Sequence, residues 1–511
     1  MNAKAKRRYG LLALIPLTSL FVACGGGGGS GPPPTPPPVG KFSNASLAGQ
    51  YALSMTGSEL CGGSGSVFTR VGSFTADGNG NITTGLEDIN VCAGTATLEF
   101  TSGQYSIAGD GRGILQLTNS TGTTNYSIAL SSTATGMIVQ TDVSATASGS
   151  FQRQNPAAFS NTAIAGGYVF DFNGIDVNGS AVNPASYVGR FDADGAGSVG
   201  NGLFDSNIGG ALSGQQLFPG GAFYQLDTNG DGTRFGRGTA NIAGRSFAFY
   251  VVDATRLKFI GTDFPSALVG DAFAQQNIAF TTASVMGSFA FLIGGSSSSG
   301  PISTGGRFTA DGTGNLSNIV LDENNSGSIT LLPNGTVTGS YTVDANQFGG
   351  GTATWTDTKS GSFSFIFYLI SPSQAVFQEI DSNIVSDGTL SGQTTTPISG
   401  AALAGDYVLG WTAVSTDEED YVGQLTLTSS GSLTGHVDLN EFATGRQFFD
   451  VPLSGNLALN GDGTLANTFT TSLQGNATPF HFTAYVANQN SIYLVGVDND
   501  RVIAGPLARQ P

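Results

Sequence analysis

One ten-residue stretch occurs four times in this 511-residue chain, at a constant interval of 117 residues. The first copy reads Gly-Ser-Phe-Thr-Ala-Asp-Gly-Asn-Gly-Asn from Gly72, and the others begin at Gly189, Gly306 and Gly423. Self-similarity at a fixed period is the signature of a chain built from repeated structural units. The sequence therefore predicts one architecture that is used four times.

The recurring stretch predicts a β-hairpin. In its first copy, Asp77-Gly78-Asn79-Gly80 separates two alternating apolar segments. Asp bonds its own backbone in turns, and Gly adopts a positive φ without a clash. The fourth copy has Thr428 and Ser429 in place of the Asp and the first Gly, yet the interval and the alternation persist. A turn tolerates such replacements more easily than a metal site or a catalytic site does.

Each repeat opens with a short helical turn, a Gly-x-aromatic step and a strand that is apolar at every second residue. About eight strands follow, joined by short turns, which favours a sequential antiparallel meander. Closure into a barrel removes the exposed edges of such a meander. We therefore expect an all-β protein of four eight-stranded up-and-down meander barrels, with β-sandwich modules as the alternative. The Gly-x-aromatic openings resemble the entry to a lipocalin- or avidin-type barrel; they are Gly49-Gln-Tyr51, Gly166-Gly-Tyr168, Gly287-Ser-Phe289 and Gly405-Asp-Tyr407.

The N-terminal segment predicts export and lipid anchoring. Lys4–Arg8 is a basic region, and the apolar segment Leu11–Val22 is too short to span a bilayer. The following Phe21-Val22-Ala23-Cys24-Gly25 resembles a bacterial lipobox, with Phe21 in place of the usual Leu. The resemblance implies that Cys24 is acylated and becomes the first mature residue. Gly25 after this cysteine implies sorting to the outer membrane, on its periplasmic or its cell-surface face.

The expected domain organisation follows from these signals. A lipoprotein signal peptide covers 1–23, and a Gly- and Pro-rich tether covers 24–42. Four β repeats follow in a row, at 43–156, 157–278, 279–395 and 396–511. The arrangement resembles uncharacterised multi-repeat bacterial surface lipoproteins, a resemblance that implies no activity.

The charge balance restricts the possible partners. The net charge is −17, with 36 acidic residues against 19 Lys and Arg. Nucleic acid is excluded, because its binding requires a basic face that releases counterions. The membrane is expected as a partner only through the N-terminal lipid. The remaining candidates are an unknown surface, a glycan or a small apolar ligand.

Two kinds of side chain were weighed as sites. Cys61 and Cys92 lie in one extracytoplasmic repeat without a nearby His, which predicts a disulfide. Asp227, Asn229 and Asp231 match the first positions of a calcium loop, but Gly238 stands where its last ligand, a Glu, belongs. The segment is better interpreted as a Gly-rich turn, so no cofactor is expected and Ca²⁺ remains only a weak candidate.

Several recurring or conspicuous polar residues are interpreted as structural. The pairs Asp88-x-Asn90, Asp205-x-Asn207, Asp322-x-Asn324 and Asp438-x-Asn440 predict Asx turns at strand ends, and Asp142, Asp263, Asp381 and Asp498 close another strand. The last strand of each repeat ends in Gln, at Gln154, Gln276, Gln393 and Gln510. Asp417–Asp420 is expected to be a solvated acidic loop, His481 to face outward, and Trp355 and Trp411 to lie in cores.

Three functions are compatible with these features. The first is a non-enzymatic envelope or cell-surface lipoprotein whose modules serve adhesion, matrix or envelope contact. The alternative is a protein that binds small apolar ligands inside lipocalin-like barrels. A hydrolase rests only on scattered carboxylates, since neither His436 nor His481 lies near a nucleophile signature. No catalytic residue is therefore assigned.

Overall fold

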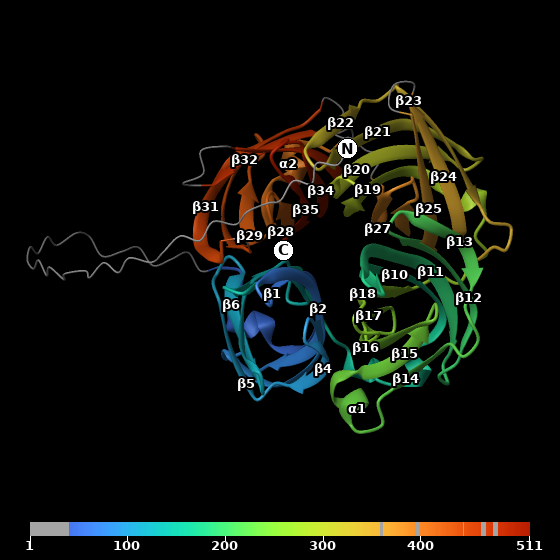
Figure 1. Ribbon diagram of the computed structural model, residues 1–511. Helices are drawn as coiled ribbons and strands as arrows, with labels where there is room; N and C mark the ends of the chain where they lie inside the picture. The colour runs from blue at the N-terminus through green and yellow to red at the C-terminus, as the bar shows by residue number, and fades with distance from the viewer. Residues whose placement is uncertain (1–39, 358–360, 394–397, 443, 461–466, 474–478) are drawn as a thin grey trace, which may run out of the picture. The chain divides into compact units, whose positions relative to one another are not determined.

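The computed structural model describes residues 40–357, 361–393, 398–442, 444–460, 467–473 and 479–511. These residues belong to one compact unit, Val39–Pro511. The predicted signal peptide, Cys24 and almost all of the tether lie outside the described residues. The described part is all-β, with four barrels that follow one another along the chain (Figure 1). The prediction of four meander barrels is confirmed, and the sandwich alternative is wrong.

Barrel 1, drawn in blue to cyan in Figure 1, contains nine strands. They are β1 (Gly49–Cys61), β2 (Ser64–Ala76), β3 (Asn81–Val91), β4 (Gly94–Glu99), β5 (Ser102–Ile107), β6 (Arg112–Asn119), β7 (Gly122–Leu130), β8 (Thr135–Asp142) and β9 (Ala145–Arg153). Each strand pairs with the next except β4 with β5, and β9 pairs with β1 to close the sheet. Strands β4 and β5 pair with opposite ends of β3, so together they occupy one of the eight strand positions of the barrel.

Barrels 2 and 3 repeat this topology. Barrel 2 contains β10 (Ala165–Asn178), β11 (Ala181–Asp194), β12 (Val199–Ile208), β13 (Ala211–Leu217), β14 (Phe223–Leu226), β15 (Arg237–Ile242), β16 (Arg245–Asp253), β17 (Arg256–Gly261) and β18 (Ala267–Ala274). Barrel 3 contains β19 (Met286–Ser297), β20 (Gly300–Asp311), β21 (Asn315–Asn325), β22 (Ser328–Leu332), β23 (Val337–Val343), β24 (Gly350–Asp357), β25 (Gly361–Ser371), β26 (Gln374–Glu379) and β27 (Ile384–Gln393). In barrel 2 a single bridge between Ser198 and Phe223 completes the closure.

Barrel 4 closes with eight continuous strands. They are β28 (Gly405–Val414), β29 (Glu418–Leu427), β30 (Ser432–Glu441), β31 (Arg446–Ala458), β32 (Asn467–Leu473), β33 (Phe480–Asn488), β34 (Ser491–Gly496) and β35 (Val502–Arg509). The long β31 spans the position that two short strands occupy in each of the other barrels.

Short helical turns precede or interrupt the strands. The predicted turn before each first strand is η1 (Asn44–Leu47), η3 (Asn161–Ala163), η4 (Thr282–Ser284) and α2 (Gly400–Leu403). The linker after barrel 1 contains η2 (Pro156–Ala158), and barrel 2 contains α1 (Asp231–Phe235). No helix in the described ranges is long and apolar enough to cross a membrane.

The recurring stretch forms the hairpin that the sequence predicts. Asp77 Oδ1 accepts from the backbone N–H of Asn79 at 2.7 Å and of Asn81 at 3.0 Å. Gly78 and Gly80 have φ of 82° and 108°, which an L side chain rarely adopts. In the fourth copy, the backbone N–H of Thr428 donates to the carbonyl of Ser432 at 2.8 Å, as the backbone N–H of Asp77 donates to the carbonyl of Asn81 at 3.0 Å in the first copy. The hairpin thus forms with and without the Asp-Gly pair.

Each barrel interior is filled by its own cluster of buried apolar side chains. The inward residues are those of the predicted alternation, such as Tyr51, Leu53 and Met55 in barrel 1. Trp355 and Trp411 are fully buried in barrels 3 and 4, which confirms their interpretation as core residues. The cavity inside barrel 3 measures about 10 Å³. It is too small for a ligand, since ligand sites usually measure about 300 Å³ or more.

Candidate functional site: the junctions between barrels

A second set of buried apolar residues lies on the outside of the barrels, where two barrels meet. Each such junction is named by the two barrels that form it, so that junction 1–2 lies between barrels 1 and 2. At junction 1–2, Ala52, Val71 and Leu86 of barrel 1 pack with Tyr250 and Ile260 of barrel 2. Smaller clusters form at junctions 2–3, 3–4 and 4–1. Burial of apolar surface outside the barrels stabilises their contact in proportion to its area. The contacts that the recurring residues make at these junctions therefore decide their role.

At three of the four junctions, the Asp of the Asp-x-Asn pair accepts a hydrogen bond from a tyrosine of the next barrel. The Tyr250 hydroxyl donates to Asp88 at 2.7 Å, Tyr368 to Asp205 at 2.7 Å, and Tyr485 to Asp322 at 2.6 Å. Each of these tyrosines points outward from its own barrel, between inward-facing apolar neighbours. Asp88 also forms an ion pair with Arg237 of barrel 2 at 2.7 Å.

The Asn of the same pair donates to backbone carbonyls of the next barrel at all four junctions. Asn90 bonds Gly261 and Ser266, Asn207 bonds Ile384, Asn324 bonds Gly496, Asp498 and Arg501, and Asn440 bonds Gln140, Asp142 and Ala145. These hydrogen bonds are buried or partly buried, so the amide and the carbonyls serve as each other's partners away from bulk water. The interpretation of these pairs as structural agrees with the contacts, but most of the side chains connect barrels instead of forming Asx turns. Asp438 is an exception, since it accepts from the backbone N–H of Asp450 at 2.7 Å within barrel 4, and Asn324 also accepts from the backbone N–H of Gly327 at 2.9 Å.

The Gln that ends each repeat makes a third connection. Its amide N–H donates to the next barrel, from Gln154 to Phe235 and Val251, from Gln275 to Phe348 and Leu369, from Gln393 to Val486, and from Gln510 to Asp110 and Leu130. The distances lie between 2.6 and 2.9 Å. In repeat 2 the connecting residue is Gln275, and not the neighbouring Gln276, which the sequence predicts as the end of the last strand.

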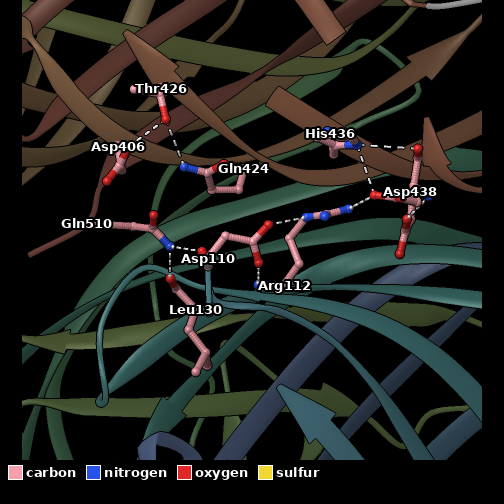
Figure 2. Close-up of polar contacts among 10 residues, drawn as sticks. Asp110, Arg112, Leu130, Asp406, Gln424, Thr426, His436, Asp438 and Gln510 are labelled. Carbon is pink, nitrogen blue, oxygen red and sulfur yellow. Dashed lines mark hydrogen bonds and ion pairs between the residues drawn. The ribbon is translucent and has the colours of Figure 1, made fainter. Parts of the chain in front are cut away.

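The fourth barrel returns to the first (Figure 2). Gln510 donates to the carbonyls of Asp110 at 2.9 Å and Leu130 at 2.7 Å, and Arg112 forms an ion pair with Asp450 at 2.7 Å. Here Ala129 occupies the place that Tyr250 has in barrel 2, so this junction has no tyrosine. The expectation of modules in a row is wrong, because their contacts form a closed cycle.

The other recurring aspartates act within their own barrels. Asp263 and Asp498 accept from the backbone N–H of Ser246 and His481, each at 2.8 Å, and Asp142 and Asp381 make longer equivalents with Asn125 and Ser364. They therefore hold the start of a neighbouring strand, and their interpretation as structural residues agrees with this contact. The His481 side chain is 46% exposed, which confirms its outward position.

Two junctions contain pairs of buried carboxyl groups. At junction 2–3, Asp171 lies against Asp387, which accepts from Asn173 at 3.0 Å. Burial raises the pKa of Asp387 to about 6, and burial together with the Asp387 charge raises the pKa of Asp171 well above its usual value. At this junction burial also raises the pKa of Asp205 to about 6.

The second pair overturns the interpretation of Asp417–Asp420 as a solvated loop. Strand β29 begins at Glu418, and Asp420 is fully buried. Barrel 1 reaches both carboxyl groups, since Ser58 donates to Glu418 at 2.6 Å and Thr146 to Asp420 at 2.8 Å. Burial raises the pKa of Asp420 to about 6 and that of Glu418 well above its usual value. Glu418 and Asp420 are therefore part of junction 4–1, whereas Asp417 is exposed.

All three candidate calcium ligands already interact with other side chains. Asp227 forms an ion pair with Arg237, and Asn229 donates to Asp231 at 2.9 Å. The Gly-rich turn that was expected here is in part the short helix α1, which begins at Asp231. Among the residues that the structure describes, no three His, Cys, Asp or Glu side chains are grouped as for a metal ion.

Cys61 and Cys92 form a disulfide, as the sequence predicts. It joins Cys61, the last residue of β1, to Cys92, the residue after β3. Lipidation of Cys24 stays a prediction.

Two cavities lie between barrels rather than inside them. One, of about 390 Å³, is lined by residues of barrels 1, 2 and 4, including Met55, Met137 and Val269. The other, of about 320 Å³, lies at junction 2–3 and is lined mainly by polar groups of Arg190, Asp192 and the linker after barrel 2. Both reach the size of small-molecule sites. Sequence reasoning missed them, because their walls come from different repeats.

Comparisons with known proteins leave the family open. No protein-family model matches the chain, and no curated protein matches it. Among solved structures, the isotype 1 transferrin-binding protein B of serogroup B Neisseria meningitidis matches at 10% identity and a TM-score of 0.21, over 71% of this chain and 79% of that chain. Intact Ap-TbpB, with N and C lobes, matches at 9% identity and a TM-score of 0.11, over 90% and 76%. At these TM-scores neither likeness carries an argument about function.

Proposed function

We propose that this protein is a non-enzymatic, lipid-anchored binding scaffold of the bacterial outer membrane. The observation that carries the proposal is the use made of the recurring polar residues. The recurring Asn and Gln side chains, and three of the four Asp side chains of the Asp-x-Asn pairs, connect one barrel to the next. The barrels thus support one another, and binding falls to outer surfaces and to the spaces between barrels.

Filled interiors support this assignment over a lipocalin-like one. The internal clusters consist of large side chains such as Phe291, Trp355 and Phe365, whose ring centroids lie 4.4 to 6.5 Å apart. Rings at such distances pack against one another and leave little space between them. Small apolar ligands inside the barrels therefore have no supporting observation.

Anchoring is tested by metabolic labelling with palmitate in a Gram-negative host that expresses the full chain. The label is expected on the wild-type protein and absent from Cys24→Ala, and only the wild type should sediment with outer membranes. Cys61→Ala/Cys92→Ala is the matched control, because it removes the other cysteines and should retain the label. An unlabelled wild-type protein in the soluble fraction would contradict the proposal. Protease treatment of intact cells then identifies the membrane face.

A further inference from the structure

The cavity at junction 2–3 is lined in part by Gly167, at a position where the other barrels have a polar side chain. In the strand registers, Gly167 lies opposite Asp192, as Gln50 lies opposite Thr75, Ser288 opposite Thr309 and Asp406 opposite Thr426. A Cβ atom on Gly167 would lie 2.9 Å from Nη2 of Arg190 and 3.0 Å from Oε1 of Gln275. A side chain at this position would therefore displace Arg190 and Gln275, which form part of the cavity wall.

The polar side chains at the equivalent positions make contacts of their own. The Gln50 amide donates to Ser73 at 3.0 Å and to the carbonyl of Arg234 in barrel 2 at 2.7 Å. Asp406 accepts from Thr426 at 2.6 Å and pairs with Lys41 at 3.1 Å. Gly167 cannot make such a contact, and it lines the cavity of about 320 Å³ at junction 2–3.

Arg190 lies in the wall of this cavity with its guanidinium almost entirely buried. The side chain is 4% exposed, and the guanidinium lies over the Phe348 ring at 4.6 Å. Its terminal nitrogens bond Asp192, Gln275 and the carbonyl of Asn201. Its Nε–H, however, has no acceptor among the described residues. The Nε atom is itself buried from water, so a ligand in the cavity contacts the groups around Arg190 rather than this N–H.

The chemistry of the wall restricts the ligand. Arg190 and Asp192 form an ion pair with each other, so this part of the wall has no net charge and favours a neutral ligand over an ion. The linker and the loop before β24 contribute amide groups that donate and accept at once, from Gln276, Asn277, Asn346 and Gln347. A hydroxyl group also donates and accepts, so a neutral polyhydroxyl ligand matches all of these groups. Ile278, 40% exposed at the same site, offers an apolar contact to a ring face.

We propose that the cavity bounded by Gly167, Arg190, Asp192 and the linker at 276–279 binds a neutral saccharide of one or two rings. The inference rests on the proposed role as a binding scaffold and adds the ligand class. It does not depend on the lipid anchor. The side-chain amides of Gln276, Asn277, Asn346 and Gln347 bond the sugar hydroxyls.

Binding is tested by isothermal titration of the folded chain from residue 24 with glucose, galactose, N-acetylglucosamine, maltose, lactose and N,N′-diacetylchitobiose. At least one is expected to bind with a Kd below about 5 mM. Gly167→Gln, which introduces the side chain of Gln50, should weaken that binding at least tenfold. Gly220→Gln is the matched control, because an added Cβ there meets no atom within 4 Å. Its affinity should equal that of the wild type.

Three outcomes overturn the inference. They are no binding by any of the six sugars, unchanged binding by Gly167→Gln, and stronger binding of galacturonate than of galactose. Circular dichroism and the melting temperature establish that each variant is folded. If Gly167→Gln fails to fold, Asp192→Thr, which introduces the residue of the other three barrels, serves instead and should show the same loss. Failure here leaves palmitate labelling unaffected, so the two proposals fail separately.

Discussion

At the scale of single residues, the junctions depend on carboxyl groups that lie away from water. Asp205 and Asp322 each accept from a tyrosine of the next barrel, and Asp171 and Asp387 lie against each other. Removing a charge from water is costly, so a buried carboxyl group retains its proton to a higher pH than an exposed one. The state of these junctions is therefore linked to pH.

The stability of the protein is predicted to fall between pH 5 and pH 8. Asp387 and Asp420, with pKa values raised to about 6, bind more protons in the folded chain than in the unfolded chain over this range. A raised pKa favours the folded state below the unfolded value, and this contribution is lost as pH rises through the folded value. Since one pKa unit corresponds to about 1.4 kcal/mol, Asp387→Asn should raise the free energy of unfolding at pH 8 by about 1–3 kcal/mol.

Urea unfolding at pH 5 and pH 8 measures this change. The difference between the two pH values should become smaller in Asp387→Asn than in the wild type. Asp77→Asn is the control, since hydrogen bonds from Asn81 and Asn79 lower the pKa of this exposed group to about 2. Its titration lies outside the range, so the difference should stay as in the wild type. A wild-type protein that gains stability from pH 5 to pH 8 would contradict the prediction.

At the scale of secondary-structure elements, the hairpin after the second strand of each barrel shows what a local pattern can specify. Asp77 organises the turn through its own backbone, and Gly78 supplies the positive φ. The fourth copy replaces both with Thr428 and Ser429 and makes the turn through a hydroxyl and a backbone bond. The two versions should therefore respond differently to substitution.

Gly78→Ala is predicted to lower the free energy of unfolding by about 1–2 kcal/mol, because an L residue is strained at this φ. The new Cβ would also lie 3.1 Å from that of Ala48. Ser429→Gly in the fourth copy is the matched reverse change. Since Ser429 does not have a positive φ, it should alter stability by less than about 0.5 kcal/mol. Thermal unfolding of the two variants gives both values, and equal effects would refute the distinction.

The elements also mark the limit of prediction from sequence. Alternation and turn residues act over a few positions, so the strands, the hairpins and the barrel topology could be predicted. The partner of Asp88 is Tyr250, 162 residues away, and no local pattern connects the two. One signal was available in the run Phe247–Val252, which is apolar on both phases of the alternation. Such a run is typical of a strand buried on both faces, and here the outward face forms the junction.

At the scale of the whole described unit, one junction differs from the other three. Junctions 1–2, 2–3 and 3–4 join barrels that are consecutive in the chain, whereas junction 4–1 has no covalent link. It also lacks the tyrosine, and its apolar cluster centres on the small residues Ala129, Val139, Val408 and Val422. We therefore expect junction 4–1 to open before the others.

Asn440→Ala/Gln510→Ala is predicted to open junction 4–1 while the barrels stay folded. The two amides donate to five carbonyls of barrel 1, so their loss leaves several buried acceptors without partners. Hydrogen exchange should increase at least tenfold in the outward-facing parts of β8 and β28, and the radius of gyration should increase. The matched control, Asn90→Ala/Gln154→Ala, should open less, because the chain still links barrels 1 and 2. Equal effects in the two double variants would contradict this ranking.

The closed cycle has a consequence for how such a chain can be encoded. Lys41 at the entrance to barrel 1 bonds the main-chain oxygen of Pro511 and pairs with Asp406 of barrel 4, so the two ends of the described unit meet. A short peptide could join them, and the chain could instead be cut in any of the three linkers. Each such circular permutant would retain all four junctions. The position of the chain termini in this closed cycle is therefore set by where the coding sequence starts, and the fold itself does not require it.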